Sequence, residues 1–299
     1  MEPRDAKAFR TRLMRWYRAN GRHDLSWRLT RDPYAVLVSE VMLQQTQVDR
    51  VLPYFERWMG LWPTLGALAE ASAAKVIREW AGLGYNRRAL GLQRLAQTVS
   101  ALPVDLAELR TLPGIGPYTA SAIACFARGE RVVVADTNIA RVVARVELGA
   151  PDAKAVPVQA VMAAAEALLP RRDARAHNLA LMDLGAMVCT ARSPKCERCP
   201  VRALCAWRAS GYPVVERVPR SAERFEESAR YARGRIVDAL RLRPMAGNEL
   251  SLLLPAAHRE RLRVYLAALE RDGMIERLDG EVWALPGDQG RTSMASPKL

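Results

Sequence analysis

The chain has 299 residues, and 50% of them are hydrophobic, which is enough for about two domains with a sizeable core. No window approaches the ~18 uninterrupted apolar residues of a membrane-spanning helix, so a soluble, cytoplasmic protein is expected. The formal net charge is +13, and arginine carries most of the excess. Because the planar guanidinium suits phosphate oxygens, nucleic acid is the expected partner, although a coding bias toward arginine would raise the charge without any ligand.

Helices dominate the predicted structure from Asp5 to about Trp207. Ala, Leu and Val recur there at three- and four-residue spacing, short Pro or Gly breaks separate the runs, and strand-like alternation is nearly absent. The predicted helices span residues 6–19, 33–47, 51–60, 73–81, 87–100, 156–169 and 174–188. A mainly α domain is therefore expected over residues 1–210.

A linker and a second, smaller domain are predicted after this region. Residues 211–225 contain Pro213, Pro219 and mixed charges with little apolar periodicity, as linkers do. Residues 226–286 predict three helices, at 229–242, 247–254 and 256–272, and a hairpin at 274–285 that turns at Asp279-Gly280. This pattern indicates a winged-helix-like α+β domain, and the short polar end, 287–299, is expected to be disordered.

A glycine-rich turn between two predicted helices is the first motif with functional content. Residues 112–119 read Leu-Pro-Gly-Ile-Gly-Pro-Tyr-Thr, with a helix on each side. Gly114 and Gly116 allow a tight turn, and the N–H groups exposed at the following helix start can bind DNA phosphate without reading sequence. We interpret the segment as a helix-hairpin-helix, and an ordinary turn between helices is the alternative.

Asp136 follows this hairpin at the start of another predicted helix. Arg141 and Arg145 lie on one face of that helix. Helix capping is the simplest explanation for an isolated Asp-x-Asn. The order of hairpin, aspartate and a later cysteine cluster makes capping alone a weaker explanation for Asp136.

Four of the five cysteines form a compact C-x6-C-x2-C-x5-C cluster: Cys189, Cys196, Cys199 and Cys205. Four soft thiolates suit an iron–sulfur cluster or zinc, and the spacing matches neither the paired knuckles of zinc ribbons nor a ferredoxin run. Two disulfides are the alternative, but the first thirty residues contain no secretory signal, because arginines interrupt every apolar run.

The order of these motifs resembles the helix-hairpin-helix DNA glycosylases of the endonuclease III superfamily, and within it the MutY-type adenine DNA glycosylases. The resemblance covers roughly residues 5–207 and includes residues 38–47, 82–85 and 181–186. It implies an endonuclease III-like fold, with a six-helix module at about 31–133 and an iron–sulfur module formed by 1–30 and 134–210. It also implies that the four clustered cysteines hold a 4Fe–4S cluster.

The activity implied by the resemblance is base excision repair, by hydrolysis of the N-glycosidic bond of adenine mispaired with 8-oxoguanine or guanine. Such a reaction benefits from an acid that protonates the base and a carboxylate that stabilises a cationic sugar. By resemblance Glu40 is the acid, Asp136 the carboxylate, and Asn138 helps to hold the site. Glu40 lies in an apolar helix, where desolvation should raise its pKa, although a salt-bridged surface position is the alternative without the family.

Tyr118 occupies the hairpin position at which bifunctional relatives carry a lysine. That lysine attacks the sugar carbon and cuts the strand through a Schiff base. A phenol cannot form the imine, so a monofunctional glycosylase is expected. Tyrosine also occurs in thymine or uracil mismatch glycosylases of the superfamily, so it does not identify the base.

DNA contacts are expected where the target base leaves the duplex. By resemblance Gln44 and Gln45 approach the mismatch and Tyr85 contacts DNA, whereas Trp27 and Arg28 form the entrance to the adenine pocket. An exposed polar helix face and a buried core tryptophan are the respective alternatives. Two positions depart from the family: Ser26 replaces a proline, and Asn86 stands where many members have a second, wedging tyrosine.

The C-terminal region also departs from the family. Its length and pattern do not resemble the Nudix-like domain that inspects 8-oxoguanine, and a short form of the family is expected, which leaves the opposite-base preference open. Arg259, Arg261 and Arg263 either contact phosphate or form a solvated basic face.

The alternative functions are a thymine or uracil mismatch glycosylase, which the Gln-Gln-Thr segment disfavours, and an iron–sulfur DNA-binding regulator, which the two carboxylates disfavour. A monomer on double-stranded DNA is expected.

Overall fold

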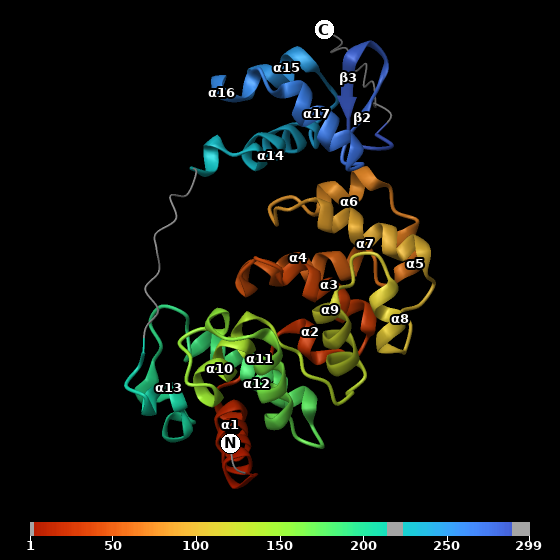
Figure 1. Ribbon diagram of the computed structural model, residues 1–299. Coiled ribbons are helices and arrows are strands. Elements are labelled where there is room, and N and C mark those ends of the chain that lie inside the picture. The colour runs from red at the N-terminus through yellow and green to blue at the C-terminus, as the bar shows by residue number, and fades with distance from the viewer. Residues whose placement is uncertain (1–2, 214–223, 289–299) are drawn as a thin grey trace. The chain divides into compact units, whose positions relative to one another are not determined.

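The computed structural model describes residues 3–213 and 224–288, and the chain divides into two compact units. The first unit comprises Met1–Glu40 and Leu102–Val218, and the second comprises Val41–Ala101 and Pro219–Leu299. Each unit is thus built from two separate stretches of sequence (Figure 1). Among the described residues, no helix is long and apolar enough to cross a membrane.

The first unit is helical. It contains α1 (Pro3–Asn20), α2 (Ser26–Leu29), most of α3 (Pro33–Leu43), α8 (Leu106–Thr111), α9 (Pro117–Ala122), the π-helical turn η1 (Ile123–Ala127), α10 (Thr137–Glu147), η2 (Ala153–Ala155), α11 (Val158–Leu168), α12 (Ala174–Met187), η3 (Cys196–Arg198), η4 (Arg202–Leu204) and α13 (Ala206–Ala209).

Helix α10 is the centre of this unit because α11, α12 and α13 all pack on it (Figure 1). Ile139, Val142, Val143 and Val146 recur at helical spacing and are buried. On α12, Gly185 allows a close approach of the two helices, since a Cβ there would lie 2.7 Å from the Cβ of Asn138. The packing therefore fixes the N-terminal turn of α10, where Asp136 lies.

The second unit combines helices of the first half of the chain with the C-terminal region. It contains the end of α3, α4 (Val48–Leu61), α5 (Leu65–Ala69), α6 (Ala73–Glu79), α7 (Arg87–Thr98), η5 (Phe225–Glu227), α14 (Ala229–Leu240), β1 (Met245–Ala246), α15 (Gly247–Leu252), α16 (Ala256–Arg259), α17 (Leu262–Arg271), β2 (Glu276–Arg277), η6 (Asp279–Glu281) and β3 (Val282–Ala284). The sheet is antiparallel in the order β1-β3-β2, with Trp283 of β3 opposite both Met245 and Arg277.

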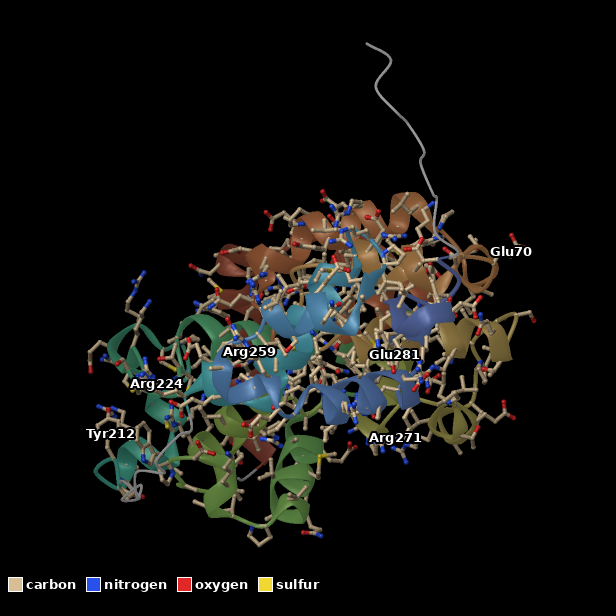
Figure 2. The ribbon with its side chains drawn as sticks, turned by 90° about the horizontal axis from the view of Figure 1, so that it is seen from above. Glu70, Tyr212, Arg224, Arg259, Arg271 and Glu281 are labelled. Carbon is tan, nitrogen blue, oxygen red and sulfur yellow. The ribbon has the colours of Figure 1, made fainter. Side chains whose placement is uncertain are left out.

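One apolar core joins α6 and α7 to the C-terminal elements (Figure 1). Ala74, Ile77 and Leu90 pack with Ile236 and Leu240 of α14 and with buried residues of α15, α17 and the sheet. The helices and hairpin predicted for the winged-helix-like domain are present, and they pack against α6 and α7. Figure 2 shows the exposed Arg259 on α16 and Arg271 at the end of α17.

Two of the predicted helices are wrong in their extent. The predicted helix 33–47 ends at Leu43, and Gln45 has a φ of 59°, which a helix cannot include. The predicted helix 256–272 is broken into α16 and α17 at Arg261. The break lets Nδ1 of buried His258 lie 2.9 Å from Oη of Tyr265, a pair that would lie about 10 Å apart along a straight helix axis.

The domain boundaries stay predictions. Residues 214–223 of the predicted linker 211–225 and residues 289–299 of the predicted tail 287–299 lie outside the described residues.

Candidate active site and cysteine centre

Glu40 is a buried acid on an almost wholly apolar helix. In α3 its side chain is 8% exposed, and Oε2 accepts a 2.7 Å hydrogen bond from Oη of Tyr118. Burial raises the pKa of Glu40 from 4.5 to about 7, and the negative charge of Asp136 adds to the shift, while the Tyr118 hydrogen bond and the charge of Arg28 oppose it. The carboxyl group can therefore be protonated near neutral pH.

Tyr118 is positioned by the predicted helix-hairpin-helix. Asp105 caps α8 by accepting hydrogen bonds from the N–H groups of Ala107 and Glu108 at 2.7 and 2.9 Å. Gly114 has a φ of +83° in the turn, which favours glycine. Gly116 is the N-cap of α9 and Pro117 its first residue. Burial and then the charge of Glu40 raise the pKa of Tyr118, so the phenol stays protonated and donates its O–H to Glu40.

Asp136 caps α10, as the capping explanation predicts, and its charge also acts on Glu40. Its Oδ1 accepts from the Ile139 N–H at 2.7 Å and its Oδ2 from Nδ2 of Asn138 at 2.9 Å. Burial raises the pKa of Asp136 even though these hydrogen bonds oppose the shift. Its charge raises the pKa values of both Glu40 and Tyr118, so the structure brings all four predicted catalytic residues into one region of the first unit. Two carboxyl groups in different environments are the arrangement that separates an acid from a charge stabiliser.

A continuous set of contacts runs from Asp136 to the cysteine centre. Asn138 accepts with Oδ1 from Nη2 of Arg141 at 2.9 Å, and Arg141 donates with Nε to the carbonyl oxygen of Cys189 at 2.8 Å. Arg145, one turn further along α10, places Nη1 at 3.3 Å from Sγ of Cys189. Sequence reasoning noted these arginines but assigned them no role. Their spacing of three and seven residues from Asn138 places them on the same face of α10, and this was the signal for a shared contact.

The four clustered cysteines line one cavity. They share it with Val142, Arg145, Leu184 and Trp207, and all four are free thiols, so the disulfide alternative is wrong. Burial and the charges of the other three thiolates raise the pKa of Cys199 to about 12, so this donor set requires cations to hold it deprotonated. Four soft thiolates that line one cavity are a donor set that fits an iron–sulfur cluster.

Trp27 and Arg28 lie in the short helix α2. Trp27 is 7% exposed, as the core alternative predicts. Arg28 donates from Nη1 and Nη2 to both carboxylate oxygens of Asp183, at 2.8 and 2.9 Å, and Asp183 is fully buried. Burial acts to raise the pKa of Asp183, but the hydrogen bonds and charges of Arg28 and Arg22 outweigh it and lower the value. Arg28 is thus held by Asp183, and its charge acts on Glu40, while its role at the pocket entrance stays a prediction.

The remaining predicted DNA contacts lie in the second unit. Gln44 and Gln45 follow the end of α3, and Tyr85 ends the loop between α6 and α7. Gln45 and Tyr85 both have positive φ, 59° and 48°. Arg88 binds both loops, since it donates to the carbonyl oxygens of Val41 at 2.8 Å and Gln44 at 2.6 Å and to those of Leu83 and Gly84 at 3.1 Å. Sequence reasoning missed Arg88, because no local pattern marks a side chain that binds carbonyl groups more than forty residues away.

The chain is similar to known DNA repair proteins along most of its length. Residues 38–170 match the HhH-GPD superfamily base excision DNA repair proteins, and residues 189–205 match the iron–sulfur binding domain of endonuclease III. An adenine DNA glycosylase of Mycobacterium tuberculosis (strain CDC 1551 / Oshkosh) is 44% identical over 93% of this chain and 93% of its own. A thermostable thymine-DNA glycosylase structure has a TM-score of 0.64 and 29% identity, covering 69% of this chain and 98% of that one. A trapped endonuclease III–DNA covalent intermediate, at 20% identity and a TM-score of 0.60 over 70% of this chain and 99% of that one, shows the fold alone.

These findings confirm several predictions from the sequence: the mainly helical, endonuclease III-like fold with a small C-terminal sheet, an enzyme of the DNA glycosylase class, a 4Fe–4S cofactor and DNA as partner. The roles of individual residues stay predictions. The chain belongs to the adenine DNA glycosylase family, within the HhH-GPD superfamily of base excision DNA repair proteins.

Proposed function

We propose that this protein is a monofunctional glycosylase that removes adenine mispaired with 8-oxoguanine or guanine in double-stranded DNA. The observation that carries the proposal is the buried Glu40 carboxyl, with its pKa near 7, hydrogen bonded to Tyr118 and facing the charge of Asp136. An acid that is part protonated at neutral pH meets the main requirement of adenine excision, because adenine is a poor leaving group until it is protonated.

In the proposed reaction Glu40 gives its proton to a ring nitrogen of the flipped adenine. The bond between the base and the sugar C1′ then breaks, and the electron pair leaves with the base. Asp136, whose carboxylate oxygens accept hydrogen bonds from the Ile139 N–H and the Asn138 amide, stabilises the positive charge at the sugar. Water adds to C1′, and its proton passes to a carboxylate, so the products are free adenine and an abasic site.

The proposed absence of strand cleavage rests on Tyr118. Its phenol, with a raised pKa and a hydrogen bond committed to Glu40, offers no amine for imine formation. Its proposed function is to tune the acid rather than to attack the sugar.

The four cysteines are proposed as the ligands that would hold the 4Fe–4S cluster. Arg145 donates to the Cys189 sulfur and Arg141 to its carbonyl group, so the two arginines connect the ligand loop with Asn138 and Asp136. The bound cluster would stabilise the cysteine loop, and these side chains hold the Asp136 carboxylate in place.

We also propose how the substrate is bound. The exposed Gly114 and Gly116 present backbone N–H groups to a phosphate, while Gln44, Gln45 and Tyr85 contact the bases of the opened duplex. A monomer acting on one flipped base and a cytoplasmic location complete the proposal. Binding should weaken steeply as salt rises, because arginines displace counterions from the DNA.

Single-turnover assays on duplexes with A, T or U opposite 8-oxoguanine or guanine test this function, with Glu40→Gln as the control. Release of adenine alone, abolished by the substitution, supports the proposal. Release of thymine or uracil instead supports the mismatch branch, which Tyr118 and the likeness to a thymine-DNA glycosylase favour as the second candidate. Strand cleavage without alkali treatment of the product would contradict the monofunctional assignment.

A further inference from the structure

Tyr85 is an exposed aromatic residue in a conformation that its neighbours must impose. Its side chain is 44% exposed, and its φ of 48° lies in the left-handed region that a tyrosine rarely occupies. Such a residue keeps its conformation only where the surrounding contacts over-determine it. Contacts with neighbouring residues must therefore hold Tyr85 in this conformation.

Two arginines contact the Tyr85 ring, and they come from distant parts of the sequence. The guanidinium of Arg88, in α7, lies 5.4 Å from the ring centroid, and that of Arg230, in α14, lies 5.3 Å from it. Arg230 also donates from Nη1 to the phenol oxygen at 2.5 Å, and its guanidinium lies 4.9 Å from the ring centroid of Phe225. Arg88 thus holds the loop, whereas Arg230 holds the tip of the side chain.

Helix α14 is itself fixed at this loop. Arg241, near its end, donates to Oδ1 of Asn86 at 2.9 Å and to the carbonyl oxygen of Ile77 at 3.1 Å. Arg233 of α14 and Arg87 of α7 both pair with Asp272. Together with the apolar core shared by α6, α7 and α14, these contacts make the C-terminal elements a rigid support for residues 85 and 86.

We propose that Arg230 is a positioning residue for base excision, which acts by orienting Tyr85 toward the DNA. Through it the C-terminal elements take part in substrate recognition although they contribute no group to the reacting bond. The inference rests on the proposed function for its assay, because Tyr85 is assigned there to the opened duplex. The cation–π contact and the phenol hydrogen bond together restrict the ring to one orientation, so less entropy is lost when it contacts the bases.

The test compares Arg230→Ala and Arg230→Lys with Arg235→Ala, an exposed arginine on the same helix. Two quantities are measured: the single-turnover rate of adenine release, and the fluorescence of 2-aminopurine placed beside the mismatch, which reports unstacking on binding. We expect Arg230→Ala to lower the rate about tenfold and reduce the fluorescence change, and Arg230→Lys to resemble it, because lysine keeps the charge but loses the planar fork. Arg235→Ala should stay within about twofold of the wild type.

The Tyr85→Phe variant separates positioning from attraction to phosphate. Tyr85→Phe removes the phenol oxygen that Arg230 contacts. Arg230→Ala should therefore lower the single-turnover rate by a smaller factor in the Tyr85→Phe background than in the wild type. Equal losses for Arg230→Ala and Arg235→Ala, or additive effects with Tyr85→Phe, would overturn the inference. If the wild type releases no base, the proposed function fails, and the fluorescence change on binding still tests Arg230. If Arg230→Ala does not fold, Arg230→Lys gives the same comparison.

Discussion

The phenol oxygen of Tyr118 lies 2.7 Å from Oε2 of Glu40 and donates the hydrogen bond that partly offsets the effect of burial on this acid. The two residues are 78 positions apart in the chain. Burial alone would leave Glu40 protonated over a wider pH range, and the phenol restrains the shift because it stabilises the ionised carboxylate. The hairpin therefore places next to the acid a group that lowers its pKa relative to burial alone.

Removal of this phenol should shift the pH dependence of base release. In the proposed reaction Glu40 acts as a protonated acid, so the rate of the wild type should fall as pH rises through its pKa of about 7. The Tyr118→Phe variant lacks the group that stabilises the carboxylate, so its pKa should rise and the descending limb should move to higher pH. Single-turnover rates between about pH 5 and 9 check this, and a limb displaced to lower pH would contradict the role of Tyr118.

Glu40 should lower the stability of the folded protein at neutral and basic pH. Its pKa is 4.5 in the reference state and about 7 in the folded protein, so the stability contributed by the protonated form is complete below about pH 4.5 and lost as pH rises through 7. Glu40→Gln removes this loss, and the variant should gain up to about 3 kcal/mol over the wild type at pH 8. Urea unfolding at pH 5 and pH 8 measures the difference, which should be small at pH 5; an equal difference at both values would show that burial does not shift the pKa of Glu40.

Gly185→Ala should lower the rate of base release, because it displaces Asn138. The added Cβ would meet the Cβ of Asn138 at 2.7 Å and its carbonyl oxygen at 2.9 Å, so the start of α10 must move away from α12. We expect a loss of activity of about tenfold or more and a lower melting temperature. Gly91→Ala is the matched control, because a Cβ at this position in α7 meets no atom within 4 Å, and helix propensity predicts a small gain in stability. Normal activity of Gly185→Ala would show that the position of Asn138 is not critical.

Loss of a cluster ligand should be distinguishable from loss of a buried thiol. Cys199→Ser should lower iron and sulfide from about four per chain to near zero and reduce the melting temperature, because Cys199 lines the cysteine cavity. Cys125→Ala should keep its iron, since Cys125 is buried elsewhere and contacts the Asn178 amide. Elemental analysis of the purified proteins gives the answer, and full iron occupancy in Cys199→Ser would remove this cysteine from the ligand set.

Local patterns in the sequence predicted the residues of the candidate site, but not the long-range contacts that position them. An isolated acid among apolar neighbours predicted the buried Glu40 with its raised pKa, and the cysteine spacing predicted the metal centre. The capping role of Asp136 was also visible, since it depends on residues within one turn. These features are local, and residue spacing alone encodes them.

The contacts that could not be predicted join residues far apart in the chain. Arg141 reaches the carbonyl group of Cys189, 48 positions away, and Arg88 ends α3 by binding carbonyl groups of residues 41 and 44. The helix pattern of residues 33–47 continues past Leu43, so the sequence pattern does not predict the end of α3, where the Arg88 contacts lie. Likewise, the apolar faces of α6 and α14 were visible, but periodicity does not say that they pack together.

The shared core of α6, α7 and the C-terminal elements has a consequence during synthesis on the ribosome. Ala74, Ile77 and Leu90 leave the ribosome long before Ile236, Tyr265 and Leu285, the residues that cover them. Because domains fold as their residues emerge, the second unit must wait with an uncovered apolar surface while residues 102–218 are made. The ligand loop for the iron–sulfur cluster lies within that interval, so cluster insertion can precede completion of the second unit. A nascent chain stalled after residue 218 should therefore recruit chaperones, and one released after residue 288 should not.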